Sequence, residues 1–117
     1  KAMSNWKANR KKEGLNKDYS ILRTLRQEKR ITDEFEVMFS GLSLEEVLAL
    51  KLELSSRLFK GKFFGLPIWK SLPYIIREAT LKYALSVTKS KKDASRLLGL
   101  NLSEMNKMIK RYIPEGF

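Results

Sequence analysis

The segment 90–112 constrains the fold of this chain more than any other part of the sequence. Apolar residues recur at helical spacing on both sides of Gly99. A glycine at such a position commonly ends a helix, because it adopts the left-handed backbone conformation without a steric penalty. The pattern therefore predicts two short helices, Lys91–Leu98 and Leu102–Tyr112, joined by a tight turn at Gly99.

Residues typical of helix ends flank both predicted helices. Ser90 followed by Asp93, and Asn101 followed by Glu104, both have the spacing of a capping box. Pro114 stands where the second helix should end. These signals favour the same two boundaries as the apolar periodicity.

The second helix is predicted to be amphipathic, with a basic outer side. Met105, Ile109 and Tyr112 share one side and should face inward. The residues expected to face outward are polar or cationic: Ser103, Asn106, Lys107, Lys110 and Arg111. Two short helices in this arrangement have the layout of a helix-turn-helix, whose second helix lies in the major groove of DNA.

Two longer helices are predicted upstream. Ser43 and Glu46 form a capping box, so that a helix of roughly four or five turns should begin at Ser43 and reach Phe59, although its leucines also alternate as in a strand. The second should run over 72–88, with Pro73 in its first turn and Ser71 as its cap.

The helix over 72–88 has two apolar stripes, which predicts a central position or a dimer interface. We expect Tyr83 and Tyr112 to be core residues. The aromatic residues of the preceding segment, Phe63, Phe64 and Trp69, are expected to pack in the core or in a dimer interface rather than on nucleic acid.

The first 41 residues give weaker signals. Residues 1–17 are polar and basic, which suggests an arm, and a weak helix follows over 18–30 with a break near Thr32. Phe35, Met38 and Phe39 then have the spacing of one or two helical turns ending at Gly41.

Composition excludes several classes of protein. The chain has no Cys and no His, so we expect neither a disulfide framework nor a metal site, and the commonest general base is absent. No Gly-rich phosphate loop precedes a helix, and no apolar run approaches membrane-spanning length. We therefore expect a protein that is not an enzyme, has no cofactor and does not bind membranes, and we place it in the cytoplasm, associated with the nucleoid.

The net charge of +11 is unevenly distributed. Residues 1–30 carry ten Lys and Arg against three acids, and residues 55–117 carry thirteen against four. Residues 31–54 are acidic, with Lys51 alone against six carboxylates. Basic material at both ends predicts a polyanionic partner, with nucleic acid first.

The sequence from about Ile75 to Tyr112 resembles the C-terminal region of the Fis family, which also ends the NtrC-type transcription activators. The run Ala-Ser-Arg-Leu-Leu-Gly-Leu-Asn at 94–101 carries the likeness, together with Met105, Ile109 and the Lys-Arg-Tyr ending at 110–112. The resemblance implies a Fis-like, all-α dimer whose two long helices interlock and whose helix-turn-helix units meet successive major grooves.

Two positions depart from the family pattern. Lys89 and Ser90 replace the usual Gly-Asn, and Leu102 replaces an Arg that reads a base. Glu104 occupies a usual contact position, where it repels phosphate but can accept a hydrogen bond from cytosine. Much of the selectivity is therefore expected to come from DNA shape. The expected DNA-binding residues are Lys89, Ser90, Lys91, Lys92, Asn101, Leu102, Ser103, Glu104, Asn106, Lys107, Lys110 and Arg111.

These observations predict a basic arm with a weak helix (1–33) and a helical part (34–117), which combines a dimerisation core (43–88) with the helix-turn-helix (90–112). The expected function is double-stranded DNA binding by a homodimer that regulates transcription or shapes DNA. Two alternatives stay open: an adaptor that contacts the transcription or replication machinery through the Leu102 face, and an RNA-binding protein that uses the basic arm.

Overall fold

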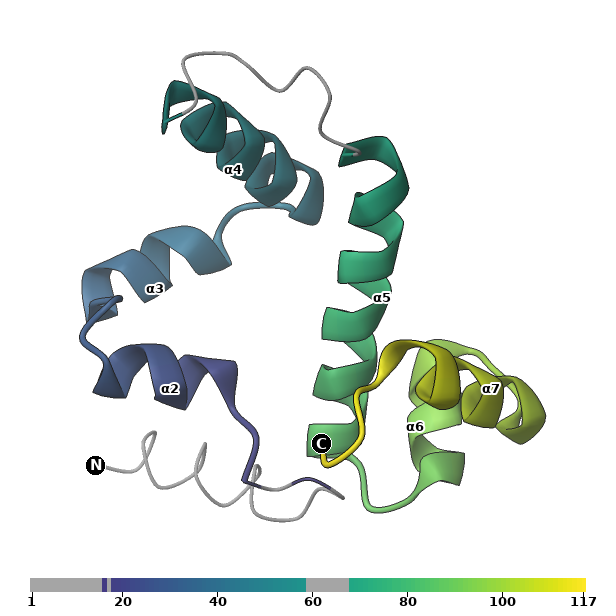
Figure 1. Cartoon of the computed structure of the whole chain (residues 1–117). Helices are drawn as coiled ribbons and strands as arrows, with labels where there is room; N and C mark the ends of the chain where they lie inside the picture. Colours follow the sequence, from purple (N-terminus) through teal and green to yellow (C-terminus); the bar gives the residue numbers. More distant parts are fainter. Residues whose placement is uncertain (1–15, 17, 59–67) are drawn as a thin grey trace. The chain divides into compact units, whose positions relative to one another are not determined.

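The computed structural model describes residues 16, 18–58 and 68–117, and these residues are all-α (Figure 1). The helices fall into two compact units, one with α2, α3 and α4 and the other with α5, α6, α7 and residues 16 and 18–20. Their bounds are α2 Ile21–Gln27, α3 Asp33–Ser40, α4 Leu44–Leu58, α5 Ile68–Val87, α6 Lys91–Leu98 and α7 Leu102–Tyr112. The expected all-α class is confirmed for the described residues. The predicted arm (1–15 and 17) and the whole segment 59–67, with Phe59, Phe63 and Phe64, lie outside the described residues.

The unit of α5, α6 and α7 has a small apolar core. Figure 1 shows α6 and α7 beside the C-terminal part of α5. The core residues are buried and come from all three helices: Leu81, Ala84 and Leu85 of α5, Ala94 of α6 and Met105 of α7. Ile109 and Tyr112 pack against this cluster, so the inward side expected for the last helix is confirmed.

The turn between α6 and α7 is a helix-ending motif centred on Gly99. Its φ of +75° lies in the left-handed region, as its position in the sequence predicts. The Gly99 N–H donates to the Arg96 carbonyl (3.2 Å) and the Leu100 N–H to the Ser95 carbonyl (2.8 Å). These two bonds satisfy carbonyls that the end of α6 would otherwise leave unpaired.

Side chains cap both short helices at their N-termini. The Asp93 N–H donates to Ser90 Oγ (3.0 Å), which is one of the two bonds of the predicted capping box. At α7 both bonds form: the Glu104 N–H donates to Asn101 Oδ1 (2.8 Å), and the Asn101 N–H donates to Glu104 Oε1 (3.0 Å).

The start of α5 and the exposure of one side differ from the sequence prediction. The helix begins at Ile68 rather than near Leu72, so Pro73 is inside it and Ser71 is not its cap. A proline there removes only one helical hydrogen bond, to the Trp69 carbonyl, and the helix continues.

Tyr83 is not a core residue, since it is 55% exposed. The α6 and α7 helices pack on the Leu81–Leu85 side and leave the Tyr83 side uncovered.

The C-terminal residues, together with residues 16 and 18–20, pack against α5. The Asn16 N–H donates to the Leu85 carbonyl (3.1 Å). The rings of Tyr19 and Phe117 meet edge to face with centroids 5.0 Å apart, and Lys82 Nζ lies 5.6 Å from the centre of the Phe117 ring. The last residue of the chain is therefore held by contacts from two separate segments.

The unit of α2, α3 and α4 is built from short helices with clear ends. The α2 helix is shorter than the predicted 18–30, because Lys29 adopts a positive φ of 58° and stops it. Thr32 caps α3, accepting from the Phe35 N–H (3.1 Å), and α3 ends before Gly41 as expected. Between α2 and α3, Arg26 Nε donates to Glu36 Oε2 (2.6 Å); this hydrogen bond raises the pKa of the Arg26 guanidinium.

The α4 helix confirms the helical interpretation of the leucine-rich segment. The Glu46 N–H donates to Ser43 Oγ (3.1 Å) and the Ser43 N–H to Glu46 Oε1 (2.8 Å), which completes the predicted capping box. Among the described side chains of α2, α3 and α4, none is buried. The apolar side chains left exposed include Phe35, Val37, Met38, Leu44, Leu50 and Leu54.

Candidate nucleic-acid interface

The outer side of α7 brings together the polar and cationic residues that the sequence placed there. The exposed residues of this surface are Leu102, Ser103, Asn106, Lys107, Lys110 and Arg111. Residues four apart on a helix are neighbours, so Leu102, Asn106 and Lys110 form one row and Ser103 and Lys107 form the next. The N-terminal half of this surface is uncharged, whereas the C-terminal half is cationic.

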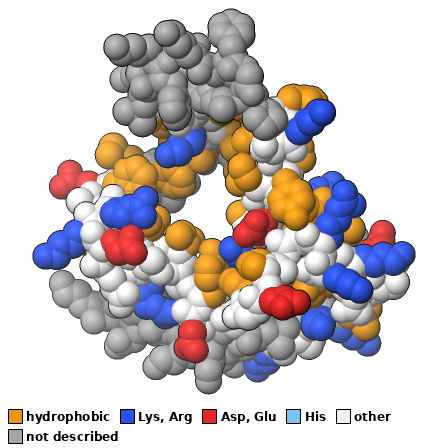
Figure 2. Space-filling view, in the orientation of Figure 1, with side chains coloured by type: hydrophobic (Ala, Val, Ile, Leu, Met, Phe, Trp, Pro, Cys, Tyr) orange, Lys and Arg blue, Asp and Glu red, His pale blue; other side chains and the backbone are white. Residues whose placement is uncertain are grey.

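Lysines also gather at the start of α6. Lys89, Lys91 and Lys92 are exposed, and Ser90, between them, uses its hydroxyl to cap the helix. Cations at a helix N-terminus oppose the helix dipole, so their placement has a local electrostatic cost that an anionic partner would remove. On the face in Figure 2, Lys and Arg side chains gather over α6 and α7.

Two acidic side chains lie within this basic region, and the structure accounts for both. Glu104 caps α7: its carboxylate accepts a hydrogen bond from the Asn101 N–H and is thereby held against the backbone. Asp93, in the first turn of α6, forms an ion pair with Arg96 three residues further along the helix, with Oδ1 and Nη1 3.6 Å apart. Of the expected contact residues, Asn101 and Glu104 thus have a structural role that the capping signal in the sequence had already indicated.

The C-terminal end of α7 is positioned by a residue that is not among the DNA-binding residues expected from the sequence. Tyr74 of α5 donates its hydroxyl to the Arg111 carbonyl (2.8 Å), and its ring meets Tyr112 edge to face with centroids 4.6 Å apart. The Arg111 guanidinium lies 5.5 Å from the centre of the Tyr112 ring. Tyr74 belongs to the second apolar stripe of α5, but periodicity alone could not reveal a contact with a helix 37 residues away.

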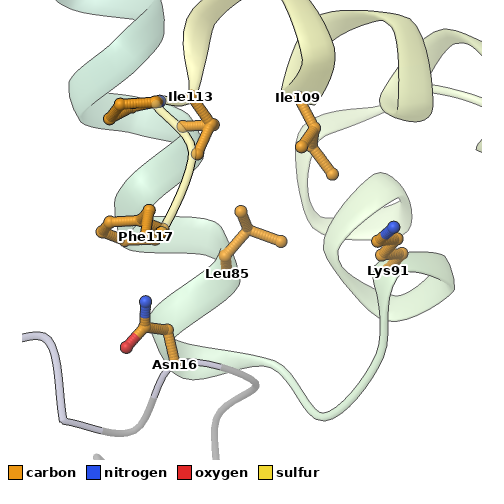
Figure 3. Close-up of a pocket in the computed structure, with 8 residues that line it drawn as sticks. Asn16, Leu85, Lys91, Ile109, Ile113 and Phe117 are labelled. Carbon is orange, nitrogen blue, oxygen red and sulfur yellow. The ribbon is translucent and has the colours of Figure 1, made fainter.

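A cavity of about 300 Å³ lies on the inner side of this region (Figure 3). Leu85, Ile109, Ile113, Pro114 and Phe117 give it a mainly apolar lining, with Asn16, Gly116 and Lys91 completing it. Lys91 is the one charged residue of this lining, so the cavity holds no acid–base pair.

The described part of the chain offers no competing site of the other classes considered. Within it, no group of acidic side chains is arranged to hold a metal ion. None of the helices described there has both the length and the apolar character needed to cross a bilayer. Glu45 and Glu46, the paired carboxylates of the sequence, lie in the first turn of α4, where Glu46 is used as a cap.

Comparisons with models of protein families, with curated proteins and with solved structures found no match to this chain. The resemblance to the Fis family therefore stays a prediction from the residues of 75–112. The geometry of α6 and α7 is therefore the observation that bears on function.

Proposed function

We propose that this chain is a double-stranded DNA-binding protein that acts as a homodimer and uses α6 and α7 as a helix-turn-helix. Its role would be to regulate transcription or to shape DNA locally. The proposal is supported above all by one observation: Met105, Ile109 and Tyr112 hold α7 on the core, so that its polar and cationic side faces solvent.

The proposed DNA-binding surface has two kinds of residue: those that would contact phosphates and those that would read base edges. Lysines at 89, 91 and 92, with Ser90, would contact the phosphate backbone where α6 begins. Ser103, Asn106 and Lys107 would approach base edges, because the first turns of a recognition helix are those that enter the major groove. Lys110 and Arg111 would hold the flanking phosphates.

Exposed apolar surface on α5 supports the homodimer. Trp69, Ile75 and Tyr83 are 89%, 58% and 55% exposed in a single chain. Ile75 and Tyr83 belong to the apolar stripe that α6 and α7 leave uncovered. Large exposed apolar patches usually mark interaction surfaces, and a second copy would also bring two α7 helices to one duplex.

Charge reversal tests the proposed interface. Replacing Lys107 and Lys110 by Glu, or Lys91 and Lys92 by Glu, should weaken binding to a random duplex at least tenfold, because each pair removes phosphate contacts and adds repulsion. Fluorescence anisotropy of a labelled duplex at one fixed salt concentration measures the change.

A matched variant controls for the overall charge. Replacing Lys29 and Lys51 by Glu changes the net charge equally, but both residues are exposed in the other unit. Its affinity should fall much less than that of either test variant. Equal losses in all three variants would mean that only total charge matters, and no loss at α6 and α7 would contradict the proposal.

A protein-interaction adaptor is the second candidate, and one observation favours it. Leu97 and Leu102, on either side of the Gly99 turn, are 54% and 45% exposed. An adaptor would depend on these leucines rather than on the lysines. The charge-reversal variants would then bind DNA no differently from the unchanged chain.

A further inference from the structure

Leu102 combines an apolar side chain with a place at the tip of the proposed reading surface. It is the first residue of α7 and is 45% exposed, whereas Met105 in the same turn is buried. It starts the row that continues through Asn106 to Lys110. An exposed leucine beside polar and cationic residues has no partner among the core residues of its own unit.

Glu104 does not compete for this position. Its Oε1 accepts from the Asn101 N–H (3.0 Å), and its own N–H donates to Asn101 Oδ1 (2.8 Å). This closed pair of hydrogen bonds holds the carboxylate at the start of the helix. The side chains free to enter a groove from the first turns of α7 are then Leu102, Ser103 and Asn106.

The chemistry of the major groove offers one apolar group to such a surface. Thymine carries a 5-methyl group there, while the other groups that distinguish the base pairs are hydrogen-bond donors and acceptors. A leucine cannot bond to those polar groups, and burying them beneath it without replacement bonds is unfavourable. Asn106, one turn further along the row, suits the donor and acceptor pair of adenine.

We propose that Leu102 contacts the thymine methyl group, so that the chain prefers thymine at the base pair beneath the start of α7. This inference rests on the proposed function, since it needs α7 in the major groove. This contact would let the residue at position 102 read a base directly, although the arginine that usually reads guanine is absent there.

Replacing thymine by deoxyuridine tests the contact, because it removes the methyl group and leaves base pairing intact. The probes are two alternating duplexes of equal length, one of dA and dT and one of dA and dU. The unchanged chain should bind the thymine duplex about fourfold tighter for each methyl group buried. Two α7 helices on one duplex would give a larger preference.

Two substitutions connect the preference to this side chain. Leu102→Ala should bind both duplexes equally, near the affinity of the unchanged chain for the uracil duplex. Leu102→Met keeps an apolar side chain of similar reach and should keep the preference. Asn106→Ala is the matched control: it should weaken binding to both duplexes and keep their ratio. Circular dichroism of each variant checks that the helices are intact.

The outcomes separate this inference from the proposed function. Equal binding of both duplexes by the unchanged chain would overturn the methyl contact while leaving DNA binding in place, as would a preference that survives in Leu102→Ala. The first of these results is also the one expected if Leu102 serves a protein partner. Failure to bind either duplex would overturn both proposals.

Discussion

At the scale of single residues, the direction of α7 depends on the backbone conformation of Gly99. Its φ of +75° lets the Leu100 N–H reach the Ser95 carbonyl and turns the chain into the next helix. A Cβ atom added to Gly99 would meet no atom within 4 Å, so any cost of a side chain there comes from backbone strain alone.

Gly99→Ala should lower the stability of the α6 and α7 region by about 1–2 kcal/mol, because alanine is strained in the left-handed region. Amide hydrogen exchange in α7, including the Met105 N–H bonded to the Asn101 carbonyl, measures the loss. Gly41→Ala is the control, since Gly41 has a φ of −83° and the added Cβ lies 3.5 Å from the Met38 carbonyl oxygen, an ordinary contact. Equal exchange in the Gly99 variant and the unchanged chain would contradict this role.

At the scale of elements, the sequence predicts correctly those helix ends that depend on neighbouring residues. The caps at Ser43, Ser90 and Asn101 and the stop at Gly99 all occur as expected, because each depends on residues within one turn. Tertiary packing decided the rest. The sequence shows two apolar stripes on α5, but it does not show which of them α6 and α7 cover. The exposure of Tyr83 could therefore not be predicted from the sequence.

The capping role of Glu104 leads to a prediction for α7 as a whole. Glu104→Gln keeps an oxygen that can accept from the Asn101 N–H, but it removes a negative charge from the proposed DNA-facing surface. Affinity for a random duplex should rise several-fold, while stability falls by about 0.3–1 kcal/mol through the lost interaction with the helix dipole. Anisotropy and urea unfolding measure the two effects. Weaker DNA binding would instead assign Glu104 to base reading, through a hydrogen bond from cytosine.

At the scale of the whole molecule, each unit leaves apolar side chains uncovered, and the charge is divided between the parts of the chain. Residues 31–54 are acidic, while α6 and α7 present exposed cations. Self-association through apolar helix faces would leave these cations available for DNA. The uncovered stripe of α5 and the leucines of α4 are the surfaces that this association would use.

Sedimentation should therefore find a dimer. The double variant with Ile75→Glu and Tyr83→Glu should be a monomer, because dimerisation would bury the two new carboxylates without partners. The monomer should bind DNA more weakly and cover a shorter duplex. Val37→Glu, at an apolar residue of α3 that is still more exposed (73%), should leave the dimer intact. If the unchanged chain sediments as a monomer, the proposed dimer is wrong.

The salt dependence of binding is the sharpest test of DNA binding through α7, because it counts phosphate contacts. The logarithm of the binding constant for a random duplex should fall linearly with the logarithm of salt concentration. In Lys107→Glu with Lys110→Glu the slope should be shallower by about two for each α7 helix on the duplex, since each lost phosphate contact removes about one. The same slope in this variant and in the unchanged chain would contradict binding through the outer side of α7.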